Sequence, residues 1–299
     1  VSVIGREELD EGKIESLADA LRWTPGVNIS GGAPGGATRR FTMLFQGLPA
    51  QYSLVLFDGR KLISEHIHTG VNLNMIPASN VERLEVMPGA ASAQYGPEAI
   101  GGVLNIIPIA PGQGSLIRAT YAYGTYNTHS FSFCNSAQVS DGVAYSISAD
   151  LNSTNGGEGE KYDGETRYPA GFKRWSVLLQ SKIFLSEHII ANVDYYHTQN
   201  VNYKDKYKIE DKGLDVKAGD RLANPSVELT LFSKNSSTRI NSYLMDFEYE
   251  LKNTTNRKWI TEVEQTFYID KNTSVLLGLN SEWQSFVRKS TPKHKRWGL

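Results

Sequence analysis

The stretch VERLEVMPGAASAQYGPEAIGGVLNII, residues 81–107, joins two apolar segments through a connection rich in glycine. Residues 81–87 are predicted to form a short β-strand. The glycines that follow permit a positive φ or a close approach of a neighbouring backbone. That these glycines only form turns remains an equally good interpretation for any one of them.

The residues before this stretch have a mixed pattern. Ile14, Leu17, Ala18 and Leu21 lie on one face of an amphipathic helix, which the pair Pro25-Gly26 ends. Further short strands are predicted at residues 27–29, 41–45 and 53–57, and Asp58-Gly59 indicates a tight turn. We therefore expect residues 1–110 to form a small α+β domain.

Four segments of this domain resemble, in order and spacing, the plug domain of TonB-dependent outer-membrane receptors. They are SLADAL with PGVNI (16–29), LVLFDGR (54–60), VERLEVMPGA (81–90) and AQYGPEAIGGVLNII (93–107). The positions that carry this structural motif are Asp58, Gly59, Arg83, Glu85, Gly89, Tyr95, Gly96, Gly101, Gly102 and Asn105.

The chain departs from the family pattern in two places. Gln46-Gly47 stands where the family often has Arg-Gly, and Met87-Pro88-Gly89 stands where the family usually has an arginine before the glycine. Arg83 and Glu85 flank a strand that looks buried. Their charges could pair with polar groups of a surrounding wall, or could simply bridge neighbouring parts of the domain.

After residue 110 the pattern changes to a period of two. Ile117, Ala119, Tyr121 and Tyr123 share one face, and residues 243–251 alternate in the same way. About nine such segments occur, each near the roughly 9–11 residues that cross a bilayer as a tilted strand. One face is apolar and aromatic, whereas the other needs water or a polar filling. A soluble sandwich or propeller also alternates and is the competing interpretation.

The connections between these segments alternate in length. Residues 140–142, 185–187, 233–238 and 270–272 are short, whereas 153–172 and 199–223 are long and polar. Outer-membrane barrels have short periplasmic turns and longer extracellular loops. The resemblance thus implies a multi-pass β-barrel over residues 111–299 in the bacterial outer membrane, with the plug in its lumen and the long loops outside.

Barrels of this type have about 22 strands, and we expect only the first nine here. The last predicted strand runs outward, which would put Leu299 in an extracellular loop. An open sheet leaves unpaired backbone groups in lipid. We therefore expect a second chain or a missing segment to complete the barrel.

Composition and motifs exclude several function classes. The net charge of −1 gives no basic face for nucleic acid. The lone Cys134 excludes an internal disulfide, and its register places it toward the lumen as an inert thiol. Ser92 lacks a G-x-S-x-G frame, and no Gly-Lys-Ser/Thr follows the glycine loop at 31–36. We expect no enzyme, no metal site and no tightly bound cofactor.

By resemblance, three plug loops reach toward an external ligand, at residues 30–40, 48–53 and 62–73. Their candidate ligand-binding residues are Arg39, Arg40, Gln51, Tyr52, His66 and His68. Arginine can fork onto carboxylate or catecholate oxygens. The two histidines point the same way if extended and could hold haem iron or a metal, although solvated loop histidines explain them as well.

The resemblance implies active import of a ferric siderophore-type ligand, energised through the TonB–ExbB–ExbD complex. Haem, cobalamin or a glycan is the alternative cargo within the same fold. A receptor-like scaffold subunit that does not transport is the alternative from another class. In either case the barrel would contact outer-membrane lipid and lipopolysaccharide.

Overall fold

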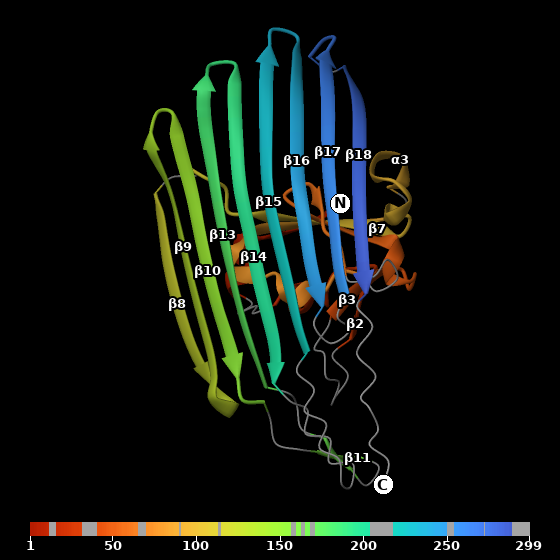
Figure 1. Cartoon of the computed structure of the whole chain (residues 1–299), viewed down its shortest axis with the longest axis vertical. Coiled ribbons are helices and arrows are strands. Elements are labelled where there is room, and N and C mark those ends of the chain that lie inside the picture. Colours follow the sequence, from red (N-terminus) through yellow and green to blue (C-terminus); the bar gives the residue numbers. More distant parts are fainter. Residues whose placement is uncertain are drawn as a thin grey trace.

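The alternating segments after residue 115 form one curved antiparallel sheet of nine strands in chain order, seen in a computed structural model (Figure 1). The structure describes residues 1–11, 16–31, 41–64, 70–89, 91–112, 115–156, 160–162, 165–167, 171–203, 218–249, 254–271 and 273–288. The strands are β8 (Leu116–Gly124), β9 (Thr128–Ser140), β10 (Val143–Thr154), β13 (Gly171–Ser186), β14 (Ile189–Tyr203), β15 (Ala218–Ser233), β16 (Ser236–Tyr249), β17 (Thr254–Tyr268) and β18 (Ser274–Arg288). The predicted strand number is confirmed.

The strands are longer than the sequence pattern predicted. They run from 9 residues in β8 to 16 in β13 and β15. The reason is that the backbone ladder does not stop where the apolar alternation stops. In β14, for example, pairing with β13 continues through the polar residues Thr198, Gln199 and Asn200.

The connections at the two ends of the sheet differ, as predicted. At one end, β9 joins β10, β13 joins β14, β15 joins β16 and β17 joins β18 through short turns. At the other end lie η5 (Thr125–Asn127), the hairpin of β11 (Glu160–Tyr162) and β12 (Glu165–Arg167), and the longer connections (Figure 1). We call these the short-turn end and the long-connection end.

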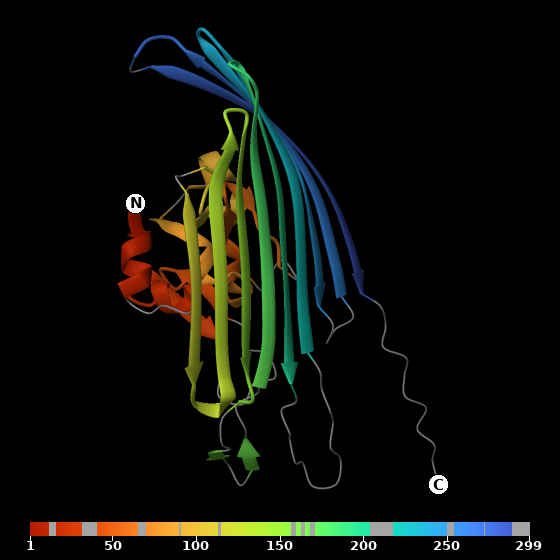
Figure 2. The same ribbon diagram turned by 90° about the vertical axis from the view of Figure 1, so that its left-hand side faces the viewer.

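The other domain lies on the concave face of the sheet (Figure 2). Its main sheet has the order β1 (Ser2–Gly5), β6 (Val81–Pro88), β7 (Gly102–Pro108), β4 (Ser53–Phe57) and β5 (Arg60–Lys61). β4 and β7 are parallel and the other pairs are antiparallel. β2 (Val27–Gly31) and β3 (Phe41–Phe45) form a separate hairpin.

The helices of this domain are short. They are α1 (Arg6–Glu11), α2 (Leu17–Leu21), α3 (Ser92–Tyr95), η1 (Ala50–Tyr52), η2 (Leu73–Met75), η3 (Ala78–Asn80) and η4 (Pro97–Ala99). α2 realises the predicted amphipathic helix from Leu17 onward, with the Ser16 side chain capping the amide of Asp19. Ile14 lies outside the described residues. No helix among those the structure describes is long and apolar enough to cross a membrane.

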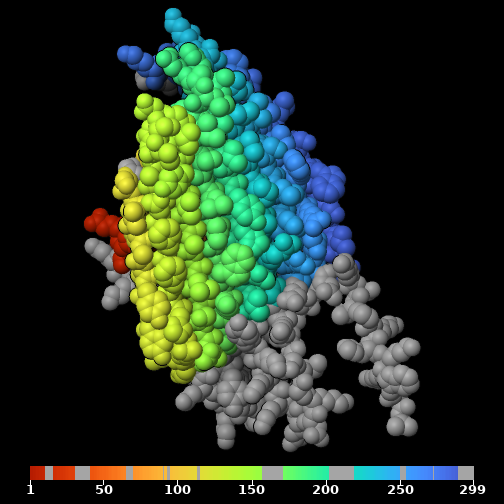
Figure 3. All heavy atoms as spheres, turned by 60° about the vertical axis from the view of Figure 1, so that its left-hand side comes forward, coloured from red at the N-terminus to blue at the C-terminus, as the bar shows by residue number. Residues whose placement is uncertain are grey.

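Figure 3 shows the convex face of the nine-stranded sheet. Exposed apolar side chains lie on this face. They include Ile117, Tyr121, Leu151, Leu179, Val193, Val227, Trp259 and Leu279. Cys134 faces the concave side and is buried, as its register predicted. On most strands, therefore, the apolar face of the alternating pattern is the convex, outward face of the sheet.

Strand β16 has the predicted apolar and polar faces, but its apolar face turns to the concave side. Tyr243, Met245 and Phe247 are buried against the smaller domain, whereas Asp246 and Glu248 lie on the other face. The cause is direct packing: the concave face meets apolar side chains here instead of water.

The two domains consequently share one hydrophobic core. It contains Phe57, Leu73 and Ile76 of the smaller domain together with Tyr196 and Phe247 of the sheet, among others. A second, small cluster around Leu54, Leu56, Ala99 and Val103 lies under α3. Each large apolar side chain buried in such a core contributes about 1.5–3 kcal/mol relative to exposure.

Candidate functional site

The turn between β4 and β5 presents charged groups to the sheet. Asp58 and Gly59 both have positive φ, 52° and 76°, as a tight Asp-Gly hairpin turn requires. The Gly59 amide donates to the Asn105 side chain at 3.1 Å. Asn105 in turn donates to Glu85 at 3.0 Å, so that β7 and β6 hold the turn in place.

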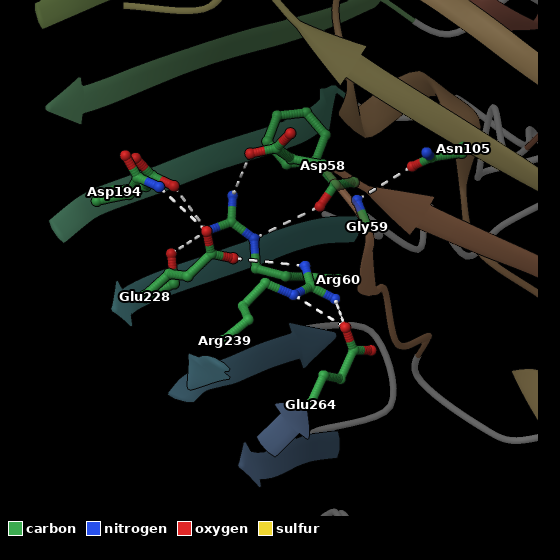
Figure 4. A network of polar contacts seen from close by, with 11 residues as sticks. Asp58, Gly59, Arg60, Asn105, Asp194, Glu228, Arg239 and Glu264 are labelled. Carbon is green, nitrogen blue, oxygen red and sulfur yellow. Dashed lines mark hydrogen bonds and ion pairs between the residues drawn. The ribbon is translucent and has the colours of Figure 1, made fainter. Parts of the chain in front are cut away.

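Arg60 follows this turn and makes a buried polar contact between the two domains (Figure 4). Its side chain is 4 % exposed and donates to the Asp194 carboxylate of β14 at 2.7 Å, and also to the Ser226 hydroxyl of β15. The Asp58 carboxylate lies 3.6 Å from the guanidinium. A buried arginine is tolerable only with such partners. Arg60 belongs to the segment LVLFDGR, but nothing in the sequence indicates this contact.

A second group of charged side chains lies on the sheet beside Arg60 (Figure 4). The register of β15 with β16 places it nearer the short-turn end. Arg239 of β16 contacts Glu264 of β17 at 2.7 Å and Glu228 of β15 at 3.5 Å. Asn192 donates to the same Glu228 at 3.1 Å. These groups line the concave face beside the smaller domain and link four neighbouring strands.

Two tyrosines of the sheet hold the smaller domain by combining apolar and polar contacts. The Tyr196 ring stacks on Phe57 with centroids 5.0 Å apart, and its hydroxyl donates to the Met75 carbonyl at 2.5 Å. The Tyr243 hydroxyl accepts the amide of Lys61 at 3.1 Å. Buried tyrosines usually find such hydrogen-bond partners.

A cavity of about 330 Å³ lies between η1, β5 and strands β17 and β18. Gln51 and Tyr52 line it, so the structure places these two predicted ligand-binding residues at a real cavity. Lys258 of β17 contacts Glu282 of β18 at 2.7 Å, and Lys61 contacts the same carboxylate at 3.5 Å. Nothing in the sequence signalled that these three charges would meet.

The other four predicted ligand-binding residues, Arg39, Arg40, His66 and His68, lie outside the described residues. Among the described residues, no group of three or more histidine, cysteine or acidic side chains could hold a metal ion. The ligand-binding roles of Arg39, Arg40, His66 and His68 therefore stay predictions.

The predicted glycines serve close packing at two positions. A Cβ on Gly102 would lie 2.7 Å from both the Met87 carbonyl oxygen and the Phe45 ring, and one on Gly101 would lie 3.0 Å from the Tyr52 carbonyl. Gly102 also has a φ of 153°. The interpretation as simple turn glycines does not hold for these two.

Gly89 and Gly96 differ from that pair. Both have positive φ, 105° and 90°, without a crowded Cβ position. Gly96 ends α3, and Tyr95 packs against the small cluster under that helix. These two glycines therefore do form turns.

Within the part of the chain that the structure describes, Arg83 and Glu85 bond inside the smaller domain and not to the nine-stranded sheet. Arg83 donates to Glu85 at 2.8 Å, and the second oxygen of Glu85 accepts from Asn105. The possibility that they pair with the wall is therefore not realised, and the bridging interpretation holds. Arg60, three residues after the end of β4, makes the contact that was sought at Arg83.

Comparison with known proteins identifies the smaller domain. Residues 1–103 match the family model described as the TonB-dependent Receptor Plug Domain. The chain therefore carries a plug domain of the TonB-dependent receptor type. Its α+β domain is the plug, and its nine-stranded sheet corresponds to the N-terminal part of the barrel in that family.

Individual relatives agree with this assignment. The chain is 27 % identical over 208 residues to the vitamin B12 transporter BtuB of Photobacterium profundum, a match that covers 69 % of this chain and 34 % of the relative. The chain thus spans about a third of the length of this curated relative.

Solved structures show the same fold. A ferric enterobactin receptor mutant of Pseudomonas aeruginosa in complex with enterobactin aligns with a TM-score of 0.75 at 18 % identity, over 95 % of this chain and 49 % of that one. The siderophore receptor PirA of Acinetobacter baumannii aligns with a TM-score of 0.73 at 16 % identity, over 95 % and 47 %. Members of this outer-membrane family are transporters or receptors rather than enzymes.

Proposed function

We propose that the receptor imports a ferric siderophore-type ligand across the bacterial outer membrane. The observation that carries this proposal is a plug held on the concave face of barrel strands, with a ligand-sized cavity under its η1 loop at the long-connection end. The volume of about 330 Å³ falls in the range of small-molecule sites. Neighbouring structures named as siderophore receptors support the choice of cargo.

The direction of transport follows from the two ends of the sheet. In outer-membrane barrels the short turns are periplasmic and the long loops extracellular. The ligand then enters beside η1, and the TonB–ExbB–ExbD complex supplies energy from the periplasmic side. Outer-membrane lipid and lipopolysaccharide cover the apolar convex face.

Closure of the barrel requires strands beyond the nine. In the sheet, β8 and β18 each pair on one edge only among the described strands. Backbone groups at a lipid-exposed edge cost several kcal/mol when unpaired. We propose that further strands, from a longer chain or from a second one, complete the barrel.

Cobalamin is the second candidate cargo, because the curated relative is named as a vitamin B12 transporter. Haem remains a candidate through His66 and His68. Replacing both histidines with alanine is expected to weaken haem binding severalfold if haem is the ligand. Unchanged haem binding would show that the two histidines are ordinary solvated loop residues and not haem ligands.

The test of import is uptake by cells that carry the gene and by cells that lack it. Iron-starved cultures are given labelled ferric catecholates and hydroxamates, and separately labelled cobalamin. We expect TonB-dependent uptake of at least one ferric complex to require the gene. Equal uptake of every compound by both strains contradicts transport and favours a scaffold role.

A further inference from the structure

The contacts between plug and wall are unequal around the plug. Toward β13–β16 the interface has an apolar centre, because Leu178, Tyr196, Leu222, Tyr243, Met245 and Phe247 belong to the common core. A smaller cavity of about 180 Å³ lies beside Arg60 on this side. The Arg60–Asp194 pair reinforces that side, with both partners at least nine-tenths buried. Separation there would expose a large apolar area and leave a buried charge without its partner.

Toward β17 and β18 the interface is polar and contains the cavity. Its lining includes Gln51, Ser64, Asn256, Lys258 and Gln284. Asn256 donates to the Ser64 carbonyl at 2.8 Å and accepts from Gln284 at 2.8 Å. Water and polar solutes can replace such hydrogen bonds at low net cost.

The charges at this cavity are balanced. The ammonium groups of Lys61 and Lys258 share the Glu282 carboxylate, and Glu98 adds a second acidic group at the cavity. Lys61 and Glu282 are partly exposed, so their ion pair contributes little stability and can be remade when a ligand enters. The lining therefore favours a ligand bound through hydrogen bonds rather than through net charge.

We infer that the passage for ligand opens on this side, between η1 and β5 of the plug and strands β17 and β18 of the wall, and that the cavity is its first polar binding subsite. The plug separates from the wall here while its apolar side stays attached to β13–β16. This inference rests on the proposed import function and adds the route and the subsite to it.

Reversible cross-links across the two sides test the route. In the background Cys134→Ser, one variant carries Ser64→Cys with Asn256→Cys across the cavity. The matched control carries Ser79→Cys with Asp150→Cys, whose parent side chains are hydrogen-bonded between η3 and β10. A short bis-methanethiosulfonate reagent bridges each pair in native cells, and dithiothreitol removes the bridge.

Bridging across the cavity is expected to reduce uptake about tenfold or more, with recovery after reduction, whereas the control bridge changes it less than about twofold. Uptake that survives the cavity bridge overturns the inference. So does an equal loss with both bridges, because the whole plug would then have to leave the wall.

A second measurement needs no ligand. Lys258→Cys places a thiol in the cavity, and Ser148→Cys places one on the concave face at β10, where Ser148 is fully buried. Modification of the thiol at position 258 by a bulky maleimide is expected to rise several-fold in energised cells with TonB, and modification at position 148 is expected to stay constant. Equal rates with and without TonB at position 258 overturn the route, even where the uptake test has upheld import.

Discussion

Removing the Arg60 charge is the most direct test of how the plug is held. Arg60→Met keeps an unbranched apolar stem but leaves the Asp194 carboxylate, 8 % exposed, without its guanidinium partner. Loss of one member of a buried ion pair typically costs about 3–5 kcal/mol. Since 1.4 kcal/mol is about a factor of ten, the equilibrium for opening of this region should rise roughly a hundredfold to a few thousandfold.

Hydrogen exchange of the β4 and β5 amides in the folded protein measures that opening. The matched control is Arg83→Met, because the Arg83–Glu85 pair is half-exposed and lies within the plug. Its loss should cost less than about 1 kcal/mol.

The double variant Arg60→Met with Asp194→Leu completes a thermodynamic cycle. Because it removes both charges, we expect it to recover most of the loss. Additive effects of the two single substitutions, or a cost for Arg60→Met no larger than for the control, would refute the buried tether.

Three further predictions concern packing and pH. Tyr196→Phe keeps the stacked ring but leaves a plug carbonyl unpaired, so that the free energy of unfolding in denaturant should fall by about 1–3 kcal/mol; an unchanged value argues against that hydrogen bond. Gly102→Ala puts a Cβ 2.7 Å from backbone and ring atoms and should make the plug sensitive to protease. Gly89→Ala, with no atom within 4 Å of its Cβ, should lower the free energy of unfolding by only about 1 kcal/mol. Similar protease sensitivity of the two variants would contradict the crowding at Gly102. A hydrogen bond from Arg6 lowers the pKa of Asp10. The stabilisation of α1 by the ionised Asp10 is therefore complete above the pKa of an unfolded aspartate, about 3.9, and is lost as pH falls through the lower folded-state pKa. Hydrogen exchange of the α1 amides should show this acid dependence, and Asp10→Asn should abolish it.

Much of the fold was predictable because it depends on local patterns. The plug segments are defined by turn residues and glycines at fixed spacing, and Asp58-Gly59 and Gly102 adopt the backbone conformations that their types permit. The number of strands and the alternation of short and long connections followed from periodicity and loop composition. These signals need only neighbouring residues.

The contacts between the domains were not predictable in the same way. A period of two separates the faces of a strand but does not say which face meets lipid, so it did not predict that the apolar face of β16 turns inward. Arg60 finds Asp194 across 134 residues of sequence, and Lys61 finds Glu282 across 221. Such pairs depend on the register and curvature of the whole sheet, which single-sequence patterns do not contain.

The shared core has a consequence for how the protein reaches its native state. The Phe57 ring of the plug packs against the Tyr196 ring of β14. The core of the plug is therefore incomplete until strands far downstream have paired. Contacts of such long sequence separation form slowly, because the loop entropy is lost before they stabilise the chain. The plug is synthesised first, and its apolar surface stays exposed until β13–β16 have formed. The rate at which these strands assemble therefore determines how long that surface can associate with other chains.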